Sequence, residues 1–229
     1  MLAKEYNVGM KLPKELGQSK TPIGWFLSEK YDGYRARFDS DKKCFVSRAQ
    51  KGFNAPEWFK KAMVPVHHLD GELWAGRENF QDMGVVRKKN PDPLEWKNIK
   101  FVVYDLPNHE GDFETRINAL SEIIKLNNSR WNLIRLNLEE PYRSLDCPLV
   151  MADQIKIKTM KQFNEIYDKV ISEGGEGVMI KDPKSPYEDK RSNFLLKYKP
   201  NFDSEAILLI IQTVKVNMKV CLVDLYVNH

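Results

Sequence analysis

A lysine in a tight turn is the first residue of this sequence that could support covalent chemistry. Lys30 follows an apolar run and precedes Asp32-Gly33, a pair typical of a turn between two strands. An amine attacks phosphorus only when deprotonated, and nearby cations favour that form because like charge destabilises the ammonium. Lys197 and Lys199 could supply those cations, since residues two apart on a strand project from one face. Together these lysines indicate a site for a phosphate group.

Two glutamates complete a candidate site. Glu72 stands at the end of an apolar run, and Glu176 stands between a glycine-rich turn and another apolar run. A carboxylate beside a core strand is costly unless it is paired or binds a ligand or metal. With Lys30, these glutamates predict a magnesium-nucleotide site.

The elements that must position these residues are mostly strands. Because strands outnumber helices and do not alternate regularly with them, we predict an α+β fold rather than a doubly wound parallel one. Apolar patterning predicts strands at Trp25–Glu29, Tyr34–Phe38, Cys44–Ser47, Leu69–Leu73, Lys100–Tyr104, Gly177–Ile180, Phe194–Tyr198 and Ala206–Thr213. Helical patterning covers Pro56–Met63, Thr115–Leu126 and Lys161–Ser172.

Composition restricts the class of protein but does not identify its function. The 229 residues are 42% hydrophobic and 30% charged with a net charge of +4, which permits a polyanionic partner without requiring one. No apolar run approaches the roughly 20 residues that span a bilayer, and no secretory signal opens the chain. Cys44, Cys147 and Cys221 lack disulfide or metal-type spacing. We expect an intracellular protein of the nucleus or cytoplasm, monomeric, neither secreted nor bound to a membrane.

Five short motifs occur in a fixed order between about Met1 and Pro200. They are Lys-x-Asp-Gly-x-Arg, Asp-Gly-Glu-Leu, an aromatic-Asp pair, Glu-Gly-Val-Met-x-Lys and Lys-x-Lys. This order resembles the covalent nucleotidyltransferase superfamily of DNA ligases, RNA ligases and mRNA capping enzymes. Gly24-Trp25 and Lys181-Asp182-Pro183 narrow the resemblance to ATP-dependent DNA ligases, of the minimal kind found in viruses and bacteria.

The resemblance implies a role for each matching residue. Lys30 would become covalently adenylated, and Arg48 would contact the 5′-phosphate of a DNA nick. Glu176, with Glu72, would support the divalent metal, and Tyr104 would stack on adenine where the family commonly has phenylalanine. The nucleotide-binding residues implied are Glu29, Arg35, Glu72, Tyr104, Met179, Lys197 and Lys199.

The resemblance also implies a fold, a reaction and partners. The fold would be a nucleotidyltransferase, ATP-grasp-like, with mainly antiparallel sheets flanked by helices and an AMP pocket between the sheets. ATP and Mg²⁺ would load Lys30 with AMP, which would pass to the 5′-phosphate at a nick in double-stranded DNA. A 3′-hydroxyl would then seal the nick, in replication or repair.

The end of the chain departs from the family pattern. We expect residues 1–201 to form the adenylation domain and residues 202–229 to begin an OB-fold domain that is cut short, with a tail that fits a frameshift. We therefore expect weak or absent loading from ATP and no efficient nick sealing by this chain alone. An RNA ligase or a capping guanylyltransferase stays open as an alternative, as does a catalytically dead DNA- or nucleotide-binding remnant.

Overall fold

Two β-sheets carry the fold in the computed structural model, which describes residues 1–8 and 21–200. By its internal contacts, Met1–Lys199 forms one unit. The five-stranded sheet has the order β1 (Leu2–Glu5), β11 (Arg191–Tyr198), β10 (Val178–Lys181), β2 (Phe26–Glu29) and β9 (Ile155–Lys156). The six-stranded sheet has the order β5 (Gly52–Phe53), β4 (Cys44–Ser47), β3 (Tyr34–Asp39), β6 (Leu69–Trp74), β7 (Lys100–Asp105) and β8 (Leu149–Met151).

Most strand pairs are antiparallel, whereas β1–β11 and β7–β8 are parallel. The α-helices are α1 (Glu57–Lys61), α2 (Phe113–Arg135) and α3 (Met160–Ser172), and the 3₁₀ helices are η2 (Phe80–Arg87), η3 (Pro93–Asn98) and η4 (Tyr142–Ser144). This arrangement confirms the predicted α+β class.

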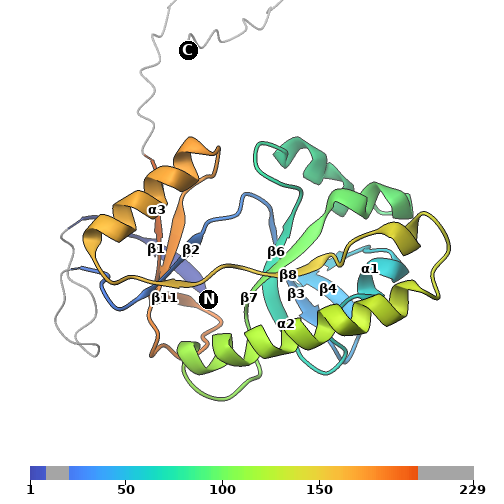
Figure 1. Cartoon of the computed structure of the whole chain (residues 1–229), viewed down its shortest axis with the longest axis horizontal. Coiled ribbons are helices and arrows are strands. Elements are labelled where there is room, and N and C mark those ends of the chain that lie inside the picture. The colour runs from blue at the N-terminus through green and yellow to red at the C-terminus, as the bar shows by residue number, and fades with distance from the viewer. Residues whose placement is uncertain (9–20, 201–229) are drawn as a thin grey trace, which may run out of the picture. The chain divides into compact units, whose positions relative to one another are not determined.

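Helix α2 covers the six-stranded sheet, as Figure 1 shows. Asp112 caps its start by accepting a hydrogen bond from the Thr115 amide at 2.9 Å. The helix continues past the predicted end at Leu126 because Trp131, two turns from Ile124, is buried in the same core. The local sequence pattern does not reveal such an extension, because tertiary contacts stabilise the last turns of the helix.

Helix α3 packs on the five-stranded sheet. Thr159 caps it, and Phe163 and Val170 join a core cluster with Val178 of β10 and Leu196 of β11. One face of this sheet is therefore buried by α3, and the opposite face is left for a site (Figure 1).

Every strand and helix predicted within the described residues is present, with ends shifted by a few residues apart from the longer α2. The strands not predicted, β1, β5, β8 and β9, have two to four residues, too few for a clear alternation. The predicted strand at 206–213 and the predicted domain at 202–229 lie outside the described residues. Among the described helices, none has the length and apolar character to cross a membrane.

Candidate active site

A cavity of about 310 Å³ lies where the two sheets face each other. Its volume is in the range of small-molecule sites, and its wall combines apolar side chains with a few charged ones, as such sites do. The apolar part includes Tyr104, Phe113, Met179 and Leu195, and the charged part includes Glu29, Lys30, Arg35, Asp70, Glu72 and Lys181. The predicted pocket between sheets therefore exists.

Lys30 forms an ion pair with Glu176 at this cavity. Their side chains are 25% and 28% exposed, so both are partly desolvated yet accessible to a ligand. The Lys30 amide donates to the Gly177 carbonyl at 2.8 Å, which extends the β2–β10 ladder by one residue. Two predicted site residues that are 146 positions apart thus meet.

The glycine-rich loop before β10 packs closely against its neighbours. Side chains at Gly175 and Gly177 would clash with them, and this close packing holds Glu176 in place. A Cβ on Gly175 would lie 2.5 Å from Val170 Cγ1 of α3. Gly177 has a φ of +150°, and a Cβ there would lie 2.4 Å from the Tyr198 carbonyl oxygen. The loop is therefore fitted between α3 and β11, with Glu176 paired to Lys30 beside the cavity.

Strand register brings the Lys-x-Lys pair to the same face as Lys30. Lys197 of β11 is opposite Met179 of β10, which is opposite Ser28 of β2. Directly opposed residues share a face, and so do residues two apart along a strand. Lys197, Lys199 and Lys30 therefore belong to one face of the five-stranded sheet, although Lys197 is paired with Glu5 at 3.2 Å.

Glu72 is the carboxylate of the cavity wall with no hydrogen bond or ion pair to another described residue. Burial raises the pKa of Glu72 to about 8, and the nearby Lys30 offsets this only in part. Carboxylate oxygens are the ligands that Mg²⁺ prefers, and a cation would compensate this buried acid. Glu72 and Glu176 therefore fit the donor set of a divalent metal.

The raised pKa of Glu72 gives a testable pH dependence. The folded state holds the proton of the Glu72 carboxyl group more tightly than the unfolded state. Ionisation of Glu72 therefore lowers the free energy of unfolding as pH rises. Without metal, the unfolding free energy of the wild type should fall relative to Glu72→Gln between about pH 4.5 and pH 8, the unfolded and folded pKa values. Urea unfolding at pH 5, 7 and 9 measures this difference, and a gap that stays constant with pH would contradict it.

Arg35 is held at the cavity by a buried acid. It donates to both oxygens of Asp70 at 3.0 and 2.7 Å, and the Tyr187 hydroxyl donates to Asp70 at 2.8 Å. Burial alone would lower the pKa of Arg35, but Asp70 outweighs it and the net shift is upward. Arg35 is therefore a fixed cation facing the cavity, and Asp70 orients it.

The sequence profile of the ATP dependent DNA ligase domain matches residues 1–199. The chain belongs to this family. A DNA ligase of Haemophilus influenzae is 29% identical over 186 residues, covering 81% of this chain and 62% of the relative. A DNA ligase of Methanothrix thermoacetophila is 34% identical over 228 residues, covering 89% of this chain and 36% of the relative. The chain thus spans less than two thirds of these curated relatives.

Solved ligase structures share the fold. A Lig E DNA ligase, studied for DNA binding with a minimal scaffold, superimposes with a TM-score of 0.65 at 24% identity, covering 87% of this chain and 67% of that one. The Chlorella virus DNA ligase-adenylate superimposes with a TM-score of 0.63 at 18% identity, covering 86% of this chain and 67% of that one. The predicted nucleotidyltransferase fold is confirmed.

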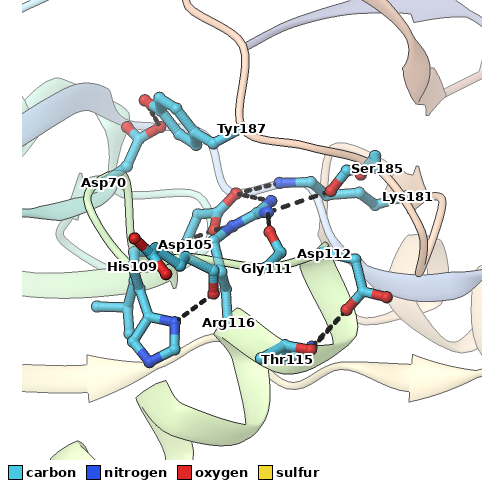
Figure 2. Close-up of polar contacts among 12 residues, drawn as sticks. Asp70, Asp105, His109, Gly111, Asp112, Thr115, Arg116, Lys181, Ser185 and Tyr187 are labelled. Carbon is cyan, nitrogen blue, oxygen red and sulfur yellow. Dashed lines mark hydrogen bonds and ion pairs between the residues drawn. The ribbon is translucent and has the colours of Figure 1, made fainter.

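Next to the cavity of this ligase domain lies a buried ionic network, drawn in Figure 2, whose Lys181 also lines the cavity. Asp105 of β7 accepts from Arg116 of α2 at 2.7 and 3.2 Å and also pairs with Lys181 of β10. Arg116 further donates to the Gly111 and Ser185 carbonyls at 2.8 and 3.1 Å. The network therefore ties the six-stranded sheet and α2 to the five-stranded sheet.

The charges in this network determine each other's ionisation. Burial alone would raise the pKa of Asp105, but Lys181 and Arg116 outweigh it and the pKa is lowered. Burial lowers the pKa of Lys181, and Asp105 opposes that shift. The Lys181 ammonium also lies 4.1 Å from the centre of the Phe113 ring, a cation–π contact at the cavity wall.

The predicted site residues fall into three groups in the ligase domain. Those that line the cavity are Glu29, Lys30, Arg35, Glu72, Tyr104 and Met179. Glu176 meets Lys30 beside it, and Lys197 and Lys199 share the face of Lys30. Arg48 is exposed in the turn after β4, at the end of the six-stranded sheet where β3 begins. Its contact with DNA stays a prediction.

Sequence reasoning gave no role to several other lining residues, namely Ser28, Tyr31, Asp70, Phe113, Gln154 and Lys181. Asp70 and Lys181 belong to two of the quoted motifs, so their position within those motifs was a usable signal. Phe113 and Gln154 carry no such signal, because they come to the cavity only through the packing of α2 and the segment before β9.

Proposed function

We propose that this ligase domain transfers AMP from ATP to Lys30, and from Lys30 to the 5′-phosphate at a nick in duplex DNA. The observation that carries the proposal is the Lys30–Glu176 ion pair beside a cavity between two sheets. The family match and the relatives named DNA ligase support the same chemistry.

In the first step the Lys30 amine attacks the α-phosphorus of ATP. A nitrogen–phosphorus bond forms while the bond to the leaving pyrophosphate breaks. The Lys30 ammonium must first lose a proton, and Glu176 is the carboxylate in contact with it. A magnesium ion held by Glu72 and Glu176 would neutralise charge on the phosphate oxygens.

The remaining residues bind and orient the nucleotide in this proposal. Tyr104 and Met179 supply apolar surface for adenine, and Arg35 with Glu72 contacts the ribose and phosphates. Lys197 and Lys199 neutralise the α-phosphate from the face that they share with Lys30. Positioning and charge neutralisation supply most of the acceleration, since phosphoryl transfer needs little covalent help beyond the lysine.

In the later steps AMP moves to the 5′-phosphate of the nick, which Arg48 contacts, and the 3′-hydroxyl then attacks that phosphate and expels AMP. Most contacts to DNA would be to phosphates, so binding would be salt-sensitive and largely independent of sequence. Residues 1–201 are proposed as the adenylation unit, and residues 202–229, the proposed start of an OB-fold domain, lie outside the described residues.

Labelled nucleotides and defined nicks test the proposal. The protein is incubated with Mg²⁺ and ATP or GTP labelled in the α-phosphate, and then with nicked duplex DNA, nicked RNA or a pre-adenylated DNA nick. For this chain alone we expect weak covalent labelling from ATP, none from GTP and no efficient sealing of the DNA nick, so that joining is seen mainly with the pre-adenylated nick. Labelling from GTP would indicate a capping enzyme, and joining of RNA alone would indicate an RNA ligase. No label and no joining would indicate a non-catalytic binding protein.

A further inference from the structure

Arg77 links three parts of the ligase domain through one guanidinium group. It lies in the connection between β6 and η2 and donates to both oxygens of Glu29 at 2.9 and 2.8 Å. Its remaining amino group donates to the Glu173 carboxylate at 2.6 Å. A two-oxygen contact of this kind fixes direction as well as distance. Arg77 therefore connects the six-stranded sheet with β2 and with the end of α3.

The two partners of Arg77 adjoin the two members of the candidate catalytic pair. Glu29 immediately precedes Lys30, and Glu173 begins the glycine-rich loop that carries Glu176. Glu29 is the last residue of β2, opposite Val178 of β10, and it lines the cavity beside Lys30 while its carboxylate accepts from Arg77. Arg77 also lines a smaller pocket of about 160 Å³ together with Glu29, Lys30 and Glu176, so it lies next to the Lys30–Glu176 pair.

The residue after Arg77 extends this contact along the loop. Gly174 has a φ of +81°, and a Cβ there would lie 2.8 Å from the Glu78 carboxylate. Residues 77–78 therefore pack over the loop as well as pairing with its first residue. The hydrogen bonds that Arg77 donates to Glu29 and Glu173 raise the pKa of Arg77, and the bond that Glu173 accepts lowers the pKa of Glu173.

We propose that Arg77 is a positioning residue for the nucleophile, a role that rests on the proposed adenylation of Lys30. Glu29 is only 14% exposed, so without Arg77 its carboxylate is left buried and unpaired and turns toward water. That movement shifts the adjoining Lys30, and release of Glu173 loosens the loop of Glu176. An attacking atom displaced by about 1 Å can lose on the order of 100-fold in rate.

Arg77→Gln, Arg77→Lys and a control, Arg130→Gln, test this role. Arg130 also bridges elements, donating to the Lys61 and Met63 carbonyls at 3.2 and 3.0 Å, but those contacts do not involve the cavity. Arg77→Gln should lower the maximal rate of Lys30 adenylation by about 10- to 100-fold and change the KM for ATP by less than about 3-fold. Arg77→Lys should recover part of the rate, since an ammonium cannot hold two carboxylates in a planar fork. Arg130→Gln should load at the wild-type rate.

A second measurement does not need activity. Hydrogen exchange followed by mass spectrometry should show faster exchange in Arg77→Gln at residues 26–31 and 173–178, with α2 unchanged. Glu29→Gln should also slow loading, and the double variant should be no slower than Arg77→Gln, because Arg77→Gln already removes the contact with Glu29.

Three results would overturn the role of Arg77. They are loading of Arg77→Gln at the wild-type rate, a raised KM with an unchanged maximal rate, and exchange that rises throughout the protein. Failure of the proposed function is distinguishable, since the wild type would then form no adduct. In that case hydrogen exchange at residues 26–31 and 173–178 still shows whether Arg77 orders these two segments.

Discussion

Replacement of Lys30 by alanine should abolish the covalent adduct with AMP, lowering its rate of formation by on the order of 10³-fold or more. The reason is that the amine itself makes the new bond to phosphorus. Among the described residues, Lys30 is the lysine that joins Glu176 at the cavity. Lys181, the other lysine of the cavity wall, is buried and paired with Asp105. Labelling with ATP carrying a radioactive α-phosphate measures the loss.

A matched variant separates chemistry from charge. Lys30→Arg keeps the positive charge and the pairing with Glu176, but arginine stays protonated and is no nucleophile at neutral pH. It should therefore fail to load as Lys30→Ala does. Both variants should still join a pre-adenylated nick within about 10-fold of the wild type, because that step breaks no bond to the lysine. An adduct of normal yield on Lys30→Ala would mean that another residue is the nucleophile.

Replacement of Asp105 by alanine should lower the free energy of unfolding by about 3–5 kcal/mol. Asp105 is 1% exposed and neutralises two buried cations, Arg116 and Lys181 (Figure 2). Without it, two positive charges are left together in the interior without a counter-ion. Urea unfolding at pH 7 measures the change, and a loss below about 1 kcal/mol would contradict it.

Two controls separate the buried network from an ordinary ion pair. Glu122→Ala removes an exposed carboxylate paired with Lys125 on α2 and should cost no more than about 0.5 kcal/mol. The triple variant Asp105→Leu, Arg116→Met, Lys181→Met replaces the whole network with apolar side chains and should recover much of the stability lost in Asp105→Ala. Recovery would show that unpaired charge, rather than lost packing, is the cost.

The network also predicts a response to acid. The pKa of Asp105 is lowered in the folded state, so its stabilising contribution is complete above its ordinary value of 3.8 and is lost as pH falls through the lower folded value. The wild type should therefore lose stability at low pH more steeply than the triple variant, which has no such carboxylate. If the stability of both proteins falls equally steeply with decreasing pH, the lowered pKa of Asp105 is contradicted.

The sequence by itself determined most of the strands, the order of the motifs and part of the cavity lining. Alternating apolar residues and the Asp32-Gly33 turn are local signals, because side-chain direction along a strand and turn geometry depend on neighbours. Local pattern therefore located β2 and β3 around Lys30 within about a residue, and β10 after Glu176. The motif pattern likewise selected six of the residues that line the cavity, whereas Phe113 and Gln154 gave no signal.

Only the tertiary structure decided which side chains pair behind that cavity. Arg77 reaches Glu29 across 48 positions, Lys181 reaches Asp105 across 76, and Tyr187 reaches Asp70 across 117. Strand periodicity shows which residues of a strand share a face, but it does not show what that face meets. That depends on how two sheets and two helices pack together. The sequence therefore identified Lys30 as the candidate nucleophile, whereas the packing of the sheets shows which residues hold it in position.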